Sequence, residues 1–294
     1  MKKFVVLLSL IFSVASGVLA QNDFEAQMRK LVISTLTISE HYVDTVNTEK
    51  LVEDAIRGML EKLDPHSQYS TAEQTKKLNE PLQGSFDGIG IQFNILDDTL
   101  MVIQTVTNGP SEKAGVMAGD MILSVNDTTI SGVKMAQDDI VKRLRGPRGT
   151  KARLGLKREG IDETIYIDVT RDKIPMNSVD AAFMLTSETG LIRFSNFAMT
   201  THQEVVDAIA KLREQGMTNL ILDVTQNGGG YLQAAAQIAS EFIPKGEMIV
   251  YTKGRAYGNQ EFKSLGGDAF QKGKVAVLVD EYSASAAEIL AGAI

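Results

Sequence analysis

The sequence predicts a multidomain α/β protein built from three successive parts. The first part places apolar residues at helical spacing, the second consists of short strands separated by turns, and the third repeats a strand–helix–strand order. We therefore expect an N-terminal helical region over residues 21–82, a small β-rich module over 83–172 and a layered α/β core over 173–294. A length of 294 residues fits two or three such units.

The first 20 residues have the pattern of an export signal. Lys2 and Lys3 precede a largely apolar stretch, and Val18-Leu19-Ala20 offers suitable cleavage positions. We expect cleavage after Ala20 and an exported protein, periplasmic or held in the cell envelope. The alternative is an uncleaved membrane anchor, although the apolar stretch is short for a span.

Composition excludes several function classes. The net charge is −7 and no basic stripe stands out, which argues against nucleic acid as the main partner. Cysteine is absent, which excludes thiol catalysis, disulfides and cysteine-based metal sites. The three histidines, His41, His66 and His202, do not have metal-ligand spacing. We expect neither a metal nor a cofactor.

The helical region is expected to form one helix over residues 23–63, with an apolar face in its second half. Asp64-Pro65 ends that pattern, and a polar stretch leads from Gln68 to Pro81. The β-rich module opens with the glycine-punctuated run 84–91. Strands are expected over 100–105, 120–125, 151–156 and 163–169, with a short helix or turn over 110–118 and a helix over 135–144.

The core begins with a strand over residues 190–197. Thr201 and Glu204 form a capping-box signature for the helix that follows, and Gly216 ends this helix. A buried-type strand over 219–225 leads to three glycines, 228–230, and to a helix that runs to about Phe242. Strands over 248–252 and 274–282 complete the alternation, which predicts parallel strand pairs.

A strand-to-helix junction near residue 283 carries the chemistry. Serines among alanines open a helix over 283–294, where unpaired N–H groups and the positive end of the helix dipole can stabilise an oxyanion. Ser283 suits the helix N-cap. The chain stops at Ile294 inside the helical pattern without a stop signal, so we expect the core to be incomplete at its C-terminus.

Five sequence blocks, in order, resemble the carboxyl-terminal processing peptidases, also called tail-specific proteases. These are serine peptidases with a Ser-Lys dyad, an inserted PDZ domain and a core of the crotonase/ClpP-like type. The resemblance covers essentially everything after the leader. The blocks are LDPHSQY (63–69), FDGIGI (86–91), AG followed by AGD (114–120), LD followed by NGGG (222–230) and SASAAEI (283–289).

The resemblance identifies Ser285 as the nucleophile, the Ala286 N–H as an oxyanion donor and Gly229 as the second donor. Glycines also let backbone approach a substrate closely, although a plain strand-to-helix turn is the structural alternative. The family often has Arg where this chain has Thr225, and usually a third serine at Ala287. The family's lysine, whose burial would lower its pKa so that it can act as base, lies beyond Ile294.

The resemblance also implies that residues 83–172 are a PDZ domain that binds a peptide C-terminal carboxylate and adds the peptide as a strand. Ordinary core packing is the alternative for the two residues expected to line a pocket for the last side chain. The implied binding residues are Phe86, Gly88, Ile89, Gly90 and Ile91 in the carboxylate loop, and Ile140 and Leu144 on the helix.

We therefore predict an exported serine endopeptidase whose partners are proteins or peptides with free C-termini, with a homodimer through the N-terminal helices implied by the resemblance. One rival is a PDZ-bearing pseudoprotease or inactive fragment. A second is a crotonase-type acyl-CoA enzyme, which the PDZ-like insertion and the leader disfavour. A Ser-His-Asp triad through His66 or His202 is the rival mechanism, and no GxSxG motif surrounds Ser285. The SxxK run at 131–134 has no Lys-Thr-Gly partner.

Overall fold

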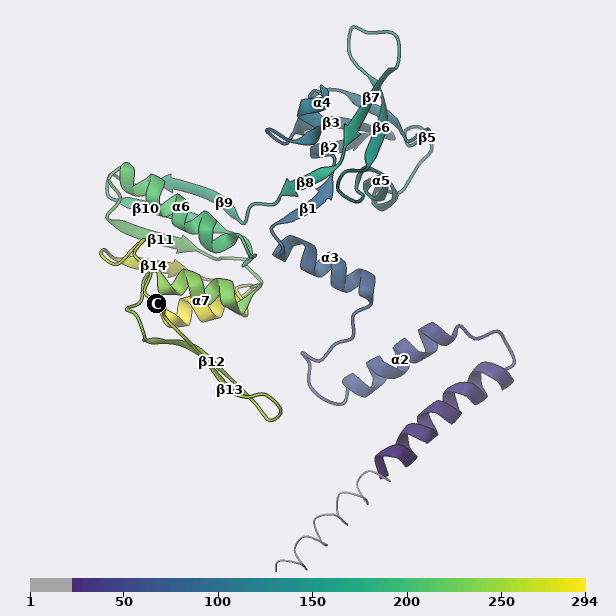
Figure 1. Cartoon of the computed structure of the whole chain (residues 1–294), viewed down its shortest axis with the longest axis horizontal. Helices are drawn as coiled ribbons and strands as arrows, with labels where there is room; N and C mark the ends of the chain where they lie inside the picture. The colour runs from purple at the N-terminus through teal and green to yellow at the C-terminus, as the bar shows by residue number, and fades with distance from the viewer. Residues whose placement is uncertain (1–22) are drawn as a thin grey trace, which may run out of the picture. The chain divides into compact units, whose positions relative to one another are not determined.

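The computed structural model describes residues 23–294 and divides the chain into two compact units, one up to Thr75 and one from Lys76 to Ile294. Figure 1 shows the elements in chain order. The expected leader and its cleavage after Ala20 lie outside the described residues. Within the described part of the chain, no helix is long and apolar enough to cross a membrane.

The N-terminal region is helical, but the single helix predicted over 23–63 is wrong. Residues 23–41 form one helix and α2 (Thr48–Leu60) a second. The break occurs because Asn47 caps α2, its side chain accepting the Lys50 N–H at 3.0 Å.

The polar stretch after residue 68 also forms a helix, α3 (Ala72–Leu82), which was not predicted. Its start carries a reciprocal capping box. The Gln74 side chain accepts the Thr71 N–H at 2.9 Å, and the Thr71 hydroxyl accepts the Gln74 N–H at 3.2 Å. Thr71 and Gln74 were therefore the signal that could have predicted α3.

The β-rich module is an antiparallel sheet in the order β2-β3-β4-β6-β7, and β5 (Thr128–Thr129) pairs with β4. The helices α4 (Pro110–Ala114) and α5 (Gln137–Leu144) complete it. One hydrophobic cluster fills the module. The strands of the main order are β2 (Ile91–Leu96), β3 (Thr99–Thr105), β4 (Met121–Val125), β6 (Lys151–Lys157) and β7 (Ile165–Thr170).

The chain enters and leaves this module through a two-stranded antiparallel ribbon. Strand β1 (Ser85–Gly88) pairs with β8 (Asp172–Pro175), with Phe86 opposite Ile174. The sequence did not predict this pairing, because its two strands are short and 87 residues apart at their first residues (172 − 85 = 87).

The core is a four-stranded sheet in the order β14-β11-β10-β9. Strands β10 (Thr189–Phe194), β11 (Asn219–Asp223) and β14 (Val275–Leu278) are parallel neighbours, which confirms the predicted parallel pairs. Strand β9 (Val179–Met184) joins the edge antiparallel and was not predicted. The strand expected near residue 248 lies outside this sheet. It is β12 (Met248–Gly254), paired in a separate hairpin with β13 (Gly258–Lys263).

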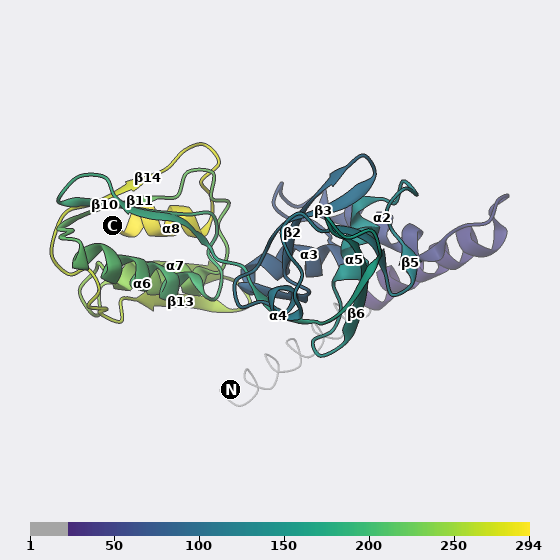
Figure 2. The ribbon, with the colours of Figure 1, turned by 90° about the horizontal axis from the view of Figure 1, so that it is seen from above.

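Three helices, α6 (Thr201–Glu214), α7 (Leu232–Ser240) and α8 (Ala286–Ala293), share one hydrophobic cluster with the sheet. Figure 2 shows them together on one side of it. The capping box predicted for α6 is wrong. Glu204 instead accepts the N–H groups of Ser178 and Val179 at 2.7 and 3.0 Å, and the Thr201 hydroxyl accepts the Ala198 N–H at 2.7 Å. Both side chains therefore join the helix to the rest of the core.

Candidate active site

Two loops meet where the parallel strands β11 and β14 end. We call residues 224–231 the glycine loop and residues 279–285 the serine turn. The strands pair in register from Leu220 opposite Val275 to Asp223 opposite Leu278, so both loops leave the same edge of the sheet. Ligands bind at this edge in open α/β sheets.

Ser285 stands at the head of α8 with a strained backbone. Its φ is 56° and its ψ is −112°, a region that a residue other than glycine rarely adopts. Ser285 is exposed, while Ala286 and Ala287 behind it are fully buried. A sharp strand-to-helix turn with a strained, exposed serine is the geometry of a nucleophile elbow. The chain thus builds an elbow without the GxSxG sequence.

Hydrogen bonds on both sides hold this conformation. Glu288 accepts the Ser285 N–H at 2.7 Å, and the Ser285 carbonyl accepts the Ile289 N–H at 3.0 Å. Glu288 sits three residues after the N-cap, as in a capping box, and places a carboxylate at the positive end of the helix. Ser285, and not Ser283, is therefore the N-cap of α8.

Ser283 has a different structural role from the predicted role as N-cap. Its hydroxyl donates to the Val224 carbonyl at 2.7 Å and accepts the Asp280 N–H at 3.0 Å. The prediction of Ser283 as N-cap is wrong because the serine turn continues for two more residues before the helix begins.

The Ala286 N–H makes no hydrogen bond within the described part of the chain, although Ala286 itself is fully buried. The neighbouring N–H groups are used, since Ser285 donates to Glu288 and Ala287 donates to the Ala284 carbonyl at 3.1 Å. Among residues 23–294, no hydrogen-bond acceptor lies on the Ala286 N–H, which is the first donor of α8. This N–H is the one that the sequence analysis predicted as an oxyanion donor beside Ser285.

Gly229 lies against the same turn, and only glycine fits there. A Cβ on Gly229 would lie 2.8 Å from the Ala284 carbonyl oxygen, 2.9 Å from Ser285 Cβ and 3.0 Å from the Ala286 nitrogen. Its φ of +101° disfavours a side chain as well. The backbone of the glycine loop thus forms the wall opposite the Ala286 N–H.

Asn227 ties the glycine loop together from inside. It is fully buried, and its side chain donates to the Phe194 carbonyl at 2.9 Å. Its side-chain oxygen accepts the Gly229 N–H at 2.9 Å. The second predicted oxyanion donor is therefore hydrogen-bonded within its own loop in this structure.

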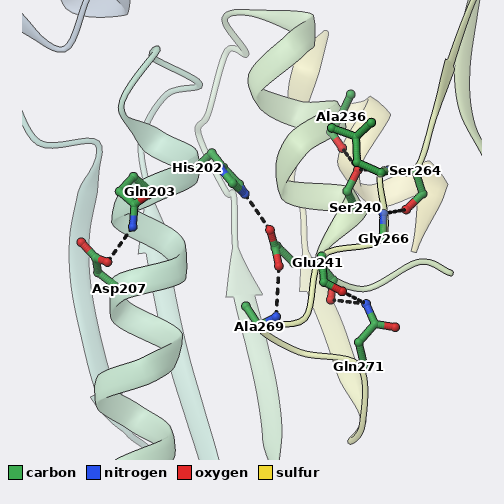
Figure 3. Close-up of polar contacts among 12 residues, drawn as sticks. His202, Gln203, Asp207, Ala236, Ser240, Glu241, Ser264, Gly266, Ala269 and Gln271 are labelled. Atoms are coloured by element: carbon green, nitrogen blue, oxygen red, sulfur yellow. Dashed lines mark hydrogen bonds and ion pairs between the residues drawn. The ribbon is translucent and has the colours of Figure 1, made fainter. Parts of the chain in front are cut away.

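The histidines do not complete a triad within the described residues. The His202 ring nitrogen lies 2.7 Å from a carboxylate oxygen of Glu241, a buried residue that also accepts the Ala269 N–H at 3.1 Å. Figure 3 shows His202 pointing to Glu241. The His66 N–H donates to Asp64 in a local turn. Across residues 23–294, no three potential ligands among His, Asp and Glu gather into a metal-binding group.

The SxxK run at residues 131–134 has a structural role. The Ser131 hydroxyl donates to the Ile122 carbonyl at 2.7 Å, which holds the loop after β5 to the sheet of the β-rich module.

Two carbonyl groups of the carboxylate loop predicted in the β-rich module are hydrogen-bonded within the module. The Ile89 carbonyl accepts the Ser111 N–H and the Gly90 carbonyl accepts the Val106 N–H, both at 3.0 Å. In a trans peptide the carbonyl and the next N–H point in opposite directions. The N–H groups of Gly90 and Ile91 therefore point away from the Ser111 and Val106 N–H groups.

Three further residues predicted to bind the peptide, Phe86, Ile140 and Leu144, are packed within the module. Phe86 is covered by the Arg145 guanidinium, 4.3 Å from its ring centre, and Arg145 also pairs with Glu80. Ile140 and Leu144 are only 2% and 4% exposed and belong to the hydrophobic cluster, so they pack as core residues. Their part in a pocket for the last side chain stays a prediction.

The AGD run holds the module together through a buried ion pair. Asp120 is 1% exposed and meets Arg158 at 2.7 Å. Burial opposes ionisation of this carboxyl, but the Arg158 guanidinium and the Met117 N–H outweigh it and place the pKa of Asp120 below its ordinary value. Asp120 therefore stays charged and structural.

Three family models match the chain in succession. They describe the N-terminal domain of the activating protease CtpB over residues 13–74, a PDZ domain over 88–169 and peptidase family S41 over 188–294. The carboxy-terminal processing protease CtpA of Bacillus subtilis is 33% identical over 98% of this chain. The chain belongs to the carboxyl-terminal processing peptidases of family S41.

The chain is also similar to another curated relative and to two solved structures. The carboxy-terminal-processing protease of Bartonella bacilliformis is 34% identical over 87% of the chain. The photosystem II D1 C-terminal processing protease covers 89% of the chain at 24% identity, with a TM-score of 0.41 and 71% of its own length. A PDZ domain of a carboxy-terminal protease from Vibrio cholerae, solved with a peptide, covers 31% of the chain at 30% identity and 99% of its own length, with a TM-score of 0.29.

The chain spans only part of its relatives. It covers 61% of the Bacillus subtilis protease and 59% of the Bartonella protease. The membership confirms the α/β fold class and the resemblance on which the site was predicted.

Proposed function

We propose that this chain belongs to an exported serine endopeptidase that captures protein C-termini and cleaves peptide bonds through Ser285. The observation that carries the proposal is the strained, exposed Ser285 at the head of α8, facing the backbone of Gly229. Strain at a serine that presents its hydroxyl to solvent is common at nucleophiles and has no benefit to folding.

In the proposed reaction, Ser285 Oγ attacks the scissile carbonyl carbon and its proton passes to a general base. The carbonyl oxygen becomes an oxyanion, the C–N bond breaks, and the leaving amine takes the proton from the base. Water then attacks the acyl-enzyme and regenerates the Ser285 hydroxyl.

The Ala286 N–H is the first oxyanion donor in this proposal, because it is unpaired and at the positive end of α8. Gly229 supplies the second donor by exchanging its bond to Asn227 for one to the oxyanion. An ionised oxygen is a stronger acceptor than the neutral amide oxygen of Asn227, which favours the exchange only when charge develops.

The general base is proposed to be the family's lysine, which follows the serine block and has no counterpart among the lysines of this chain. Lys245, Lys253, Lys263, Lys272 and Lys274 all precede Ser285 in sequence. Residues 1–294 alone are therefore expected to lack peptidase activity.

The PDZ domain supplies substrate capture in this proposal. The N–H groups of Gly90 and Ile91 would donate to the terminal carboxylate, with Gly88 and Ile89 in the same loop, and the peptide would pair beside β2. A homodimer through the N-terminal helices and a periplasmic or envelope location are proposed from the resemblance and the leader.

The test uses the protein of natural length and an unfolded protein substrate. Ser285→Ala should abolish turnover, by an amount on the order of 10⁶-fold as for other serine nucleophiles. Ser283→Ala removes one hydroxyl of the same turn and is the matched control. It should keep most activity and lose about 1 kcal/mol of stability with its hydrogen bond. Turnover that survives Ser285→Ala would overturn the proposal in favour of another nucleophile or a binding protein.

A further inference from the structure

One carboxylate oxygen of Asp280 gathers backbone donors from both loops of the site. It accepts the N–H of Gln226 at 2.8 Å and the N–H groups of Tyr282 and Ser283 at 3.1 Å each. Gln226 belongs to the glycine loop, whereas Tyr282 and Ser283 belong to the serine turn. Asp280 is half-buried, so these bonds are made close to the protein surface but not in free solution.

Only a few other bonds join the two loops. The Asn227 carbonyl accepts the Ala284 N–H at 3.1 Å, and the Val224 carbonyl accepts the Ser283 hydroxyl at 2.7 Å. Both of these acceptors are neutral. Asp280 is the charged acceptor of the set, and hydrogen bonds to an ionised acceptor are roughly twice as strong as neutral ones.

The bond from Gln226 acts on a strained residue. Gln226 has a φ of 60° and Ser285 a φ of 56°, so each loop contains one residue other than glycine in the left-handed region. Such residues persist only when surrounding contacts fix them. Asp280 holds Gln226 directly by accepting its N–H. It holds the turn that leads to Ser285 by accepting the N–H groups of Tyr282 and Ser283.

The position of these residues couples the bonds to chemistry. Gln226 lies three residues before Gly229, and Ser283 lies two residues before Ser285. A Cβ added to Gly229 would already be within 3.0 Å of the Ala286 nitrogen, so the gap that would hold an oxyanion is set by how closely the loops approach. A shift of one loop along the other would open or close that gap.

We propose that Asp280 is a positioning residue that sets the spacing between the glycine loop and the Ser285–Ala286 turn. Its carboxylate acts through backbone N–H groups and does not touch the substrate. The catalytic consequence rests on the proposed peptidase function, while the positioning of the loops does not.

The charge on Asp280 is stable at neutral pH. The Gln226 N–H, with the Ser283 and Tyr282 groups, lowers the pKa of this carboxyl below its ordinary value against the opposing effect of desolvation. We call the hydrogen bonds from Gln226, Tyr282 and Ser283 to Asp280 the clamp. The acceptor of the clamp is therefore a carboxylate, and an asparagine at position 280 would keep an acceptor oxygen but lose the charge.

The experiment compares Asp280→Ala and Asp280→Asn in the chain of 294 residues and in the protein of natural length. Hydrogen exchange is measured over residues 224–231 and 279–285. We expect exchange at Gln226 about tenfold faster in Asp280→Ala and intermediate in Asp280→Asn, because one hydrogen bond to a charged group is lost or weakened. In the natural-length protein, kcat should fall about 10²-fold in Asp280→Ala with KM nearly unchanged, as expected for misplaced groups, and Asp280→Asn should restore most of it.

Asp64→Ala is the matched control. Asp64 also accepts two backbone N–H groups, from His66 and Ser67 at 2.8 and 2.9 Å, but within a single turn of the first unit. The Asp64→Ala substitution should leave hydrogen exchange in both loops unchanged, and kcat as well. Unchanged exchange at Gln226 in Asp280→Ala would overturn the inference, and so would equal kcat in all variants. Faster exchange in Asp280→Ala, together with a wild-type protein that shows no turnover, would support the clamp and reject the peptidase function.

Discussion

The serine turn and the carboxylate loop of the PDZ domain are both proposed to present backbone N–H groups to a negatively charged oxygen, but their backbones differ. The carboxylate loop places its positive φ on Gly90, at +72°, where no side chain is needed. The serine turn places its positive φ on Ser285, whose hydroxyl is the proposed nucleophile. A binding loop can use glycine, whereas a nucleophile has to keep its side chain and rely on its neighbours to hold the strain.

The difference appears in the supporting contacts. Ser285 is held by Glu288 on the helix side, and the turn before it is held by Asp280. The carboxylate loop is held by two ordinary backbone bonds, from Ser111 and Val106.

The strongest way to break the site is Gly229→Ala. The new methyl would meet the Ala284 carbonyl and the Ser285 Cβ below 3.0 Å, and backbone cannot move aside cheaply. We expect a loss of about 3 kcal/mol of stability from the strain and at least 10²-fold in turnover of the natural-length protein. Gly228→Ala is the control, since its Cβ would meet nothing within 4 Å, and it should change stability by less than about 1 kcal/mol. Chemical denaturation and initial rates measure both. Equal effects of the two substitutions would contradict the close approach of Gly229.

The carboxylate loop should discriminate a free C-terminus from a blocked one. A peptide that ends in a small apolar residue should bind the chain at least tenfold more tightly as the free acid than as the amide, because only the acid offers a charged acceptor to Gly90 and Ile91. Isothermal titration measures both affinities. Ser285→Ala should leave the ratio unchanged, because it alters the other region only. Equal affinity for acid and amide would refute carboxylate recognition.

Replacing the strained serine by glycine should stabilise the protein. Ser285→Gly removes the conformational cost at φ 56°, so we expect about 1 kcal/mol more stability than wild type. An ordinary N-cap serine replaced by glycine would lose a few tenths of a kcal/mol. The sign of the change in denaturation midpoint, with Ser285→Ala as the reference, therefore reports whether the turn is strained. A less stable Ser285→Gly would show that it is not.

Acid should release the clamp only at low pH. The folded-state pKa of Asp280 is lowered, so its contribution is fully present above the ordinary value of 3.8 and is lost as pH falls through the lowered folded-state pKa. Exchange at Gln226, corrected for the intrinsic pH dependence, should stay constant from neutral pH down to about 4 and rise below that. Asp280→Asn should remove the rise. A rise near neutral pH would implicate a different titrating group.

Much of the fold and of the site could be predicted from the sequence, for identifiable physical reasons. The parallel strands β10, β11 and β14 follow from buried-type runs separated by helices. The family blocks identified Ser285, Ala286 and Gly229, and the structure brings their loops to one edge of the sheet. The edge strand β9 and the ribbon of β1 with β8 depend on pairing between short segments, which sequence periodicity does not report.

Two features of the site required coordinates. The elbow at Ser285 has alanines on both sides and no glycine signal, so its positive φ could not be inferred. The assignment of Ser283 as N-cap was wrong because either serine fits a cap by composition, and only the bonds of Ser283 to Val224 and Asp280 show that the helix starts later. Asp280 was missed because the predicted strand over 274–282 is too long: β14 ends at Leu278, so Asp280 lies in the turn that follows.

The most direct test of the central claim is covalent labelling of the natural-length protein with a fluorophosphonate, followed by peptide mapping. The label reacts with an activated serine and releases fluoride. The account predicts one adduct, on Ser285, that is absent in Ser285→Ala and at least 10²-fold slower to form in Gly229→Ala. Labelling at Ser283 or another serine, with Ser285 unmodified, would contradict it.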